Sequence, residues 1–151
     1  MTIESIVQTV RVKAPPSRAF ALFTQEMGRW WKAGIGKQIF TDVVMEPYVG
    51  GRWFERSADG VETDWGRVLA WEPPARLLLA WQLNAKFEFD AHFVTEVEVV
   101  FAAVDGGTTM VTLEHRNLEF FGESADTIAG KLRSGWLGML DRYVQHVATT
   151  H

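Results

Sequence analysis

The C-terminal part of the chain has the pattern of one long amphipathic helix, and a run of strand-like segments precedes it. From Ser124 to about Thr149 the apolar residues recur at steps of three and four, so at about 100° per residue they fall in one arc. The apolar residues of this arc are Ile128, Leu132, Trp136, Met139, Tyr143 and Val147. We therefore expect one face of this helix to be buried along its length.

The strand-like segments lie between residues 40 and 116. Turn-forming residues separate several of them, including Asp59–Gly60, Pro73–Pro74 and Asp105–Gly106–Gly107, which supply the backbone angles of tight antiparallel connections. Residues 84–94 form either a hairpin extension or an apolar loop. The expected strands span residues 3–13, 40–46, 51–57, 63–72, 76–83, 95–104 and 108–116.

Two short helices are expected between the first and second strands. Pro15–Pro16 opens the first, because proline is accepted in the first turn of a helix. Thr24 is expected to cap the second, which runs to Trp31. Gly34–Lys37 is expected to be a turn, since a phosphate-binding loop would need Ser or Thr where Gln38 stands.

These elements predict an α+β domain in which a curved sheet is wrapped around the terminal helix. An antiparallel sheet of seven strands has one face to bury and a single long helix to bury it against. The chain has 151 residues and no linker, repeat or low-complexity tract, so residues 1–151 are expected to form one domain.

Composition excludes several classes of function. The chain has no cysteine, which removes disulfides and thiolate metal sites, and its four histidines lack ligand spacing, so no metal or other cofactor is expected. The net charge of -4 and the mixed signs give no basic patch for nucleic acid. No apolar run reaches the length of about 18 residues that spans a membrane, and no signal peptide is seen, so we expect a cytoplasmic location.

The seven tryptophans and ten phenylalanines are the unusual part of the composition. Alternation along the strands predicts that one set of side chains faces the terminal helix. In residues 51–57 this register is less marked, because Phe54 competes with its neighbours. The inward set, apart from aliphatic residues, is Trp53, Glu55, Trp65, Arg67, Trp71, Trp81, Phe101 and His115.

Gly135 lies inside the expected buried arc of the helix, where glycine costs about 1 kcal/mol relative to alanine. Either an aromatic side chain packs on its bare backbone, or a pocket begins there. The large tryptophan side chains between sheet and helix can either fill the interior or line a space left open within it, and periodicity does not distinguish the two.

Arg67, Glu55 and His115 are the polar residues expected inside. An ion pair between Arg67 and Glu55 across neighbouring strands is one interpretation, with His115 donating to a neighbour, because buried charges are tolerated when paired. The other interpretation is a catalytic pole, in which Arg67 fixes an oxyanion and His115 or Glu55 moves a proton.

The order of elements resembles a known superfamily through four stretches of sequence. They are Gly50–Trp53, Asp64–Trp81, Gly107–Arg116 and Ser134–Trp136. On these residues the chain resembles the START-like helix-grip proteins, within them the subgroup named after the activator of the heat-shock protein 90 ATPase. The resemblance covers nearly the whole chain and implies a deep cavity between sheet and helix, with no fixed catalytic set.

Three functions follow as hypotheses. The first is binding of a small apolar or aromatic molecule in a cavity of a few hundred Å³. The second is a cyclase, aromatase or isomerase using Arg67, Glu55 and His115, and the third is a co-chaperone role. The aromatic residues in the connections are expected either to pack under loops or, where they are exposed and contiguous, to form the cavity mouth or a homodimer contact. They are Trp30, Trp31, Phe87, Phe89, Phe93, Phe120 and Phe121. The expected ligand-binding residues are Trp53, Trp65, Arg67, Trp71, Trp81, Phe101, His115, Gly135, Trp136, Met139 and Tyr143.

Overall fold

The computed structural model describes residues 3–32 and 40–150. The expected turn at Gly34–Lys37 lies outside the described residues. The described strands form one antiparallel sheet in the order β1-β7-β6-β5-β4-β3-β2. Their bounds are β1 (Ile6–Val12), β2 (Phe40–Met45), β3 (Arg52–Ser57), β4 (Glu62–Glu72), β5 (Arg76–Trp81), β6 (Thr95–Asp105) and β7 (Thr108–Arg116).

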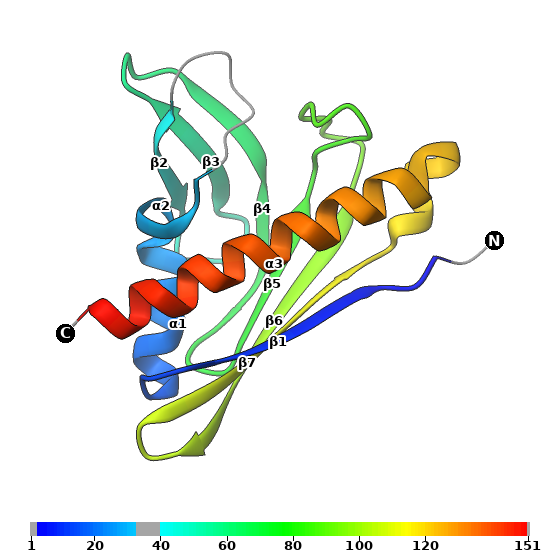
Figure 1. Ribbon diagram of the computed structural model, residues 1–151. Coiled ribbons are helices and arrows are strands. Elements are labelled where there is room, and N and C mark those ends of the chain that lie inside the picture. Colours follow the sequence, from blue (N-terminus) through cyan, green and yellow to red (C-terminus); the bar gives the residue numbers. More distant parts are fainter. Residues whose placement is uncertain (1–2, 33–39, 151) are drawn as a thin grey trace.

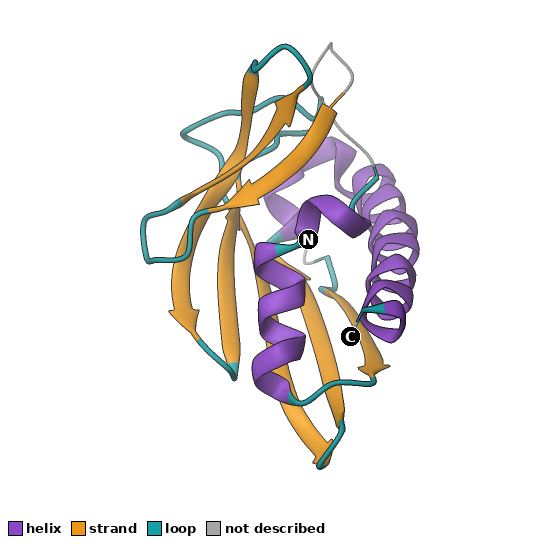
Figure 2. Ribbon diagram, turned by 90° about the vertical axis from the view of Figure 1, so that its left-hand side faces the viewer, coloured by secondary structure: helices purple, strands orange, loops and turns teal. Residues whose placement is uncertain are grey.

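The sheet curves around a long C-terminal helix, as predicted, and the helices lie on one of its faces (Figures 1 and 2). The α+β helix-grip architecture expected from the sequence is thus confirmed. The helices are α1 (Pro16–Gln25), α2 (Met27–Trp30) and α3 (Ala125–Thr149), and a 3-10 helix, η1 (Leu118–Ser124), precedes α3.

The local signals explain most of the element boundaries, with two exceptions. Thr24 does not cap α2; it lies in α1, where its hydroxyl donates to the carbonyl oxygen of Phe20 at 2.9 Å, and α2 begins after Glu26. The sequence reasoning also missed η1, which follows Asn117 (φ 66°) and is interrupted within its length by Gly122 (φ 66°). Residues 84–94 form a loop with an isolated β-bridge between Leu83 and Phe89, and further backbone hydrogen bonds hold it, such as that from the Asp90 N–H to the Gln82 carbonyl oxygen.

Strand β4 contains two irregularities that decide which of its side chains face inward. The pairing with β3 skips Trp65, because Trp53 pairs with Gly66 and Phe54 with Asp64. The pairing with β5 then skips Leu69. An extra residue in one strand reverses the alternation of side chains, and a second extra residue restores it. The side chains of residues 67 and 68, which lie between the two extra residues, therefore project to the opposite faces of the sheet from those that a regular strand would give them.

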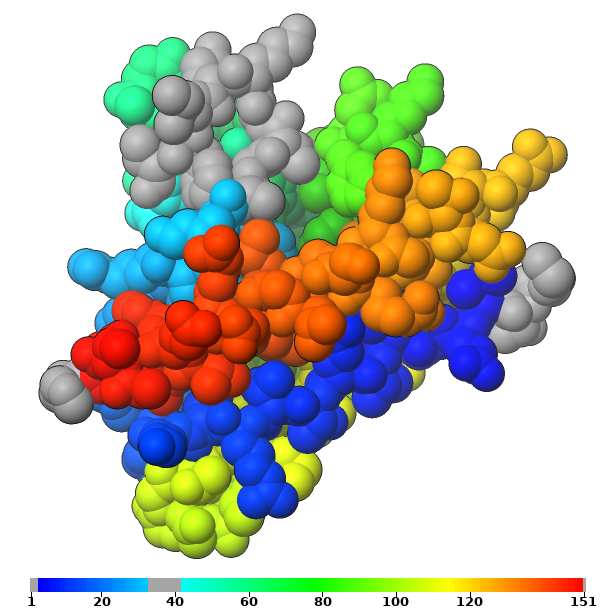
Figure 3. Space-filling model, in the orientation of Figure 1, coloured from blue at the N-terminus to red at the C-terminus, as the bar shows by residue number. Residues whose placement is uncertain are grey.

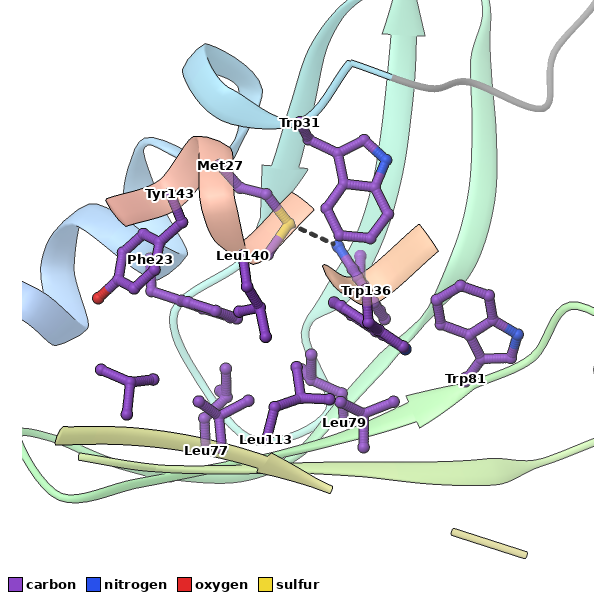
Figure 4. Packing of buried hydrophobic residues seen from close by; sticks show 14 of the residues in the cluster. Phe23, Met27, Trp31, Leu77, Leu79, Trp81, Leu113, Trp136, Leu140 and Tyr143 are labelled. Atoms are coloured by element: carbon purple, nitrogen blue, oxygen red, sulfur yellow. Dashed lines mark hydrogen bonds between the residues drawn. The ribbon is translucent and has the colours of Figure 1, made fainter. Parts of the chain in front are cut away.

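The core lies between the curved sheet and the helices, and α3 contributes a continuous buried face to it. This face contains Leu132, Trp136, Leu140 and Tyr143, which Figure 4 shows in part, above Leu77, Leu79 and Leu113 of the sheet. Leu140 takes the fully buried place that the periodicity gave to Met139, which is only partly buried.

Across residues 3–32 and 40–150, no helix combines the length and the apolar character needed to cross a membrane.

Candidate functional site

A pocket of about 150 Å³ lies between α3 and the sheet, at the level of Trp81 at the end of β5. In Figure 3 the surface is hollowed between the green loop after β5 and the orange part of α3. The pocket walls are almost entirely apolar. The lining residues are Trp31, Trp65, Trp81, Leu83, Phe87, Lys131, Leu132, Gly135, Trp136 and Met139.

Tryptophan side chains fill most of the space that was expected to be open. The ring of Trp31 lies 5.1 Å from that of Trp65 and 5.3 Å from that of Trp136, and the ring of Trp81 lies 5.8 Å from that of Trp136. Trp53 packs behind this group, 5.5 Å from Trp65 and 5.9 Å from Trp81. The expected cavity of a few hundred Å³ is therefore reduced to a smaller pocket, and Trp53 supports its wall without lining it.

One edge of α3 forms a side of the pocket. Lys131, Gly135 and Met139 follow one another at steps of four, so they lie on one line along the helix. A Cβ added at Gly135 would meet no heavy atom within 4 Å. The packing interpretation of Gly135 is therefore wrong among the described residues. Its expected place inside the buried arc is wrong as well, because Gly135 is exposed and lines the pocket.

His115 lies behind the pocket wall, and both nitrogens of its ring form hydrogen bonds. Its Nδ1 accepts from the indole N–H of Trp136 at 3.1 Å, so Nε2 carries the proton and donates to the Thr95 hydroxyl at 2.8 Å. Burial lowers the pKa of His115 from 6.5 to about 3. His115 is therefore neutral near pH 7 and holds Trp136 in place, and it does not line the pocket.

Glu55 is buried beside the tryptophans, and it accepts a hydrogen bond from the indole N–H of Trp65 at 2.8 Å. The Arg67 side chain is exposed, because Arg67 lies between the two extra residues of β4. The expected ion pair between Arg67 and Glu55 is thus wrong, and Arg67 cannot serve a catalytic pole inside the pocket. Neither Glu55 nor Arg67 is among the lining residues.

Three other expected ligand-binding residues lie in a different part of the core. Trp71 and Phe101 pack on Phe20 of α1, with ring centroids 5.0 Å and 5.1 Å away. Tyr143 contacts Phe23 and donates its hydroxyl to the carbonyl oxygen of Ala19 at 2.7 Å. Burial raises the pKa of the Tyr143 hydroxyl. None of the three lines the pocket, because α1 occupies that half of the sheet.

Tyr143→Phe is expected to lower the free energy of unfolding by about 1 kcal/mol and to leave the pocket unchanged. The substitution removes one buried hydrogen bond and keeps the ring. Urea denaturation measures the effect, and Tyr48→Phe at an exposed tyrosine is the matched control. Equal stability of the two variants would contradict the structural role given to this hydroxyl.

The expected ligand-binding set lacked five of the lining residues, which are Trp31, Leu83, Phe87, Lys131 and Leu132. For Trp31 and Phe87 the cavity mouth was one of the alternatives that the sequence left open. Lys131 could have been found, because it lies four residues before Gly135 on the same side of the helix. Phe87 lies in a loop, where alternation gives no direction. Of the other aromatic residues in connections, Phe121 is buried against Phe93 and Phe120 is exposed.

The described parts of the chain contain no group of three or more His, Asp or Glu side chains placed to hold a metal ion. The pocket wall also carries few polar atoms. The indole N–H of Trp81 is buried and has no hydrogen-bond acceptor among the described residues, which costs about 1–3 kcal/mol. Because its walls are almost entirely apolar, the site is suited to mainly apolar molecules.

Comparison with known proteins places the chain in a family. The structure of the anthrahydroquino-gamma-pyrone synthase Txn09 is 30% identical, with a TM-score of 0.68 over 95% of this chain and 97% of that one. Protein MLL2253 from Mesorhizobium loti is 20% identical, with a TM-score of 0.72 and coverage of 98% and 99%. DynU16, a putative protein in the dynemicin biosynthetic locus, is 18% identical, with a TM-score of 0.69, covering 97% of this chain and 48% of DynU16.

No curated protein matches the chain. The family model described as "Activator of Hsp90 ATPase homolog 1-like protein" matches residues 13–148, which is most of the chain. This match agrees with the resemblance seen in the sequence and with the helix-grip architecture. The chain therefore belongs to the Activator of Hsp90 ATPase homolog 1-like family.

Proposed function

We propose that the domain binds a small apolar or aromatic molecule in the pocket beside Gly135. The supporting observation is that Gly135 lines the apolar pocket together with four tryptophans, and that a Cβ added at this glycine would meet no heavy atom within 4 Å. Any larger residue at this point of α3 would project into the pocket. Glycine lowers the stability of the helix at this position, but it keeps the pocket accessible, which a larger side chain would not.

The volume of the pocket sets the size of the ligand. An apolar cavity of about 150 Å³ is large enough for one benzene ring. Aromatic rings also suit the walls, because indoles favour edge-to-face and offset contacts with other rings. A single-ring compound therefore matches the pocket better than a fused polycyclic one.

Gly135→Leu is expected to reduce the affinity for a neutral single-ring probe, benzyl alcohol, by at least about tenfold. The leucine side chain would occupy the space that the ring needs. Isothermal titration calorimetry measures the affinity, and tryptophan emission gives a second readout because four indoles line the pocket.

Gly138→Leu is the matched control. Gly138 lies on the same helix, is exposed and does not line the pocket, so it shares the gain in helix propensity without the obstruction. Equal affinity of the two variants, or an absence of binding to the unsubstituted protein, would contradict the proposed function.

A cyclase or synthase activity is the second candidate, and the 30% identity to the synthase Txn09 favours it. The side chains expected to catalyse do not support it: His115 is saturated by hydrogen bonds, Arg67 points outward, and Glu55 lies behind Trp65. Turnover of an aromatic polyketide by the purified domain, with loss in Gly135→Leu, would favour this candidate over binding alone. The co-chaperone role stays a prediction.

A further inference from the structure

Lys131 is the one ionisable residue among those that line the pocket in the described parts of the chain. It lies on the same line of α3 as Gly135, one turn earlier, and its side chain is exposed. A lysine in this place can cover apolar surface with its methylene stem and keep its ammonium group in water at the mouth. The pocket thus has an apolar interior and one positive charge at its edge.

No carboxylate in the described parts of the chain forms an ion pair with Lys131. The residues that face Lys131 along the helix, three and four positions before and after it, are Thr127, Ile128, Ser134 and Gly135. Within residues 3–32 and 40–150, Lys131 forms no ion pair. The ammonium group is therefore available to an anion that approaches the mouth.

We propose that the pocket selects small apolar acids, with the ring between the tryptophans and the carboxylate beside Lys131. This inference rests on the proposed binding function and adds the class of ligand. The overall charge of the protein is -4, so its general field does not attract anions. A preference for an acid would therefore report the local charge at the mouth.

Three probes of nearly equal shape test the proposal: phenylacetate, 2-phenylacetamide and phenethylamine. Calorimetry is expected to show phenylacetate binding about two- to fivefold more tightly than the neutral amide, the size of effect typical of one exposed ion pair. The amine is expected to bind most weakly. In 1 M salt the preference for the acid should nearly vanish, because charges at the surface are screened within about 3 Å.

Substitutions at Lys131 assign the preference to this residue. Lys131→Met keeps a long apolar side chain without the charge, so the acid and the amide should bind equally. Lys131→Glu should bind the amine most tightly. Lys131→Arg keeps the positive charge and should retain the preference for the acid. Arg133→Met is the matched control. It also removes one positive charge, two residues further along α3, but Arg133 does not line the pocket. The preference of this variant for the acid should therefore equal that of the unsubstituted protein.

The outcomes separate the two proposals. If 2-phenylacetamide binds as tightly as phenylacetate, or if Arg133→Met weakens the preference as much as Lys131→Met, selection of acids through Lys131 is overturned while ligand binding stands. If none of the three probes binds, both proposals are overturned.

Discussion

Gly66→Ala is expected to lower the free energy of unfolding by on the order of 3 kcal/mol or more. A Cβ at this position would lie 1.8 Å from the carbonyl oxygen of Ala80 and 2.9 Å from its carbonyl carbon. Both are backbone atoms of the neighbouring strand β5, which cannot move away without breaking the pairing between Gly66 and Trp81. Urea denaturation followed by tryptophan fluorescence measures the loss.

Gly106→Ala is the matched control, because a Cβ there would meet nothing within 4 Å. This variant should lie within about 0.5 kcal/mol of the unsubstituted protein. If Gly66→Ala were as stable as Gly106→Ala, the close approach of β4 and β5 at this point would be wrong.

Acidification is expected to destabilise the fold through His115. The buried imidazole is neutral in the folded state because its pKa is lowered to about 3, whereas in the unfolded chain histidine titrates near pH 6.5. The unfolded state therefore binds the extra proton first as the pH falls. The contribution of neutral His115 to the free energy of unfolding is fully present above about pH 6.5. It is lost by about 1.4 kcal/mol per pH unit as the pH falls toward 3.

The contribution of His115 is isolated by comparing pH series of urea denaturation. His115→Gln retains one acceptor for the Trp136 indole and one donor for Thr95 but does not titrate, so its stability should depend less steeply on pH. His92→Gln removes an exposed histidine and should keep the steep dependence. Parallel curves for the unsubstituted protein and His115→Gln would show that His115 is not responsible.

The sequence predicts the elements well because their signals are local. Turn dipeptides and alternation fix the strands, and the apolar arc fixes α3. The inward direction of Arg67 was predicted wrongly because the two extra residues of β4 reverse the alternation around it. Such an irregularity depends on pairing with neighbouring strands, and the sequence of β4 alone does not contain it. Gly66 beside Trp65 was the available hint, since glycine inside a strand often marks a bulge.

The pocket residues were predicted in part, and apart from Arg67 the main error concerns the position of residues along the core. Trp65, Trp81, Gly135, Trp136 and Met139 line the pocket as expected, whereas other inward residues do not. Periodicity gives the face of an element but not the position along the core, and α1 covers one half of the sheet. The volume of the pocket depends on the contact distances between indole rings, which no pattern of residue types specifies.

The place of β1 at the edge of the sheet determines when the sheet can be completed during synthesis. Its strand neighbour in the sheet is β7, so Ile6 meets His115 only after about a hundred further residues have left the ribosome. Closing a loop of that length costs about 4 kcal/mol of chain entropy. The helix that carries Lys131 and Gly135 emerges later still. The proposed binding site is therefore incomplete until the residues of α3 have been synthesised.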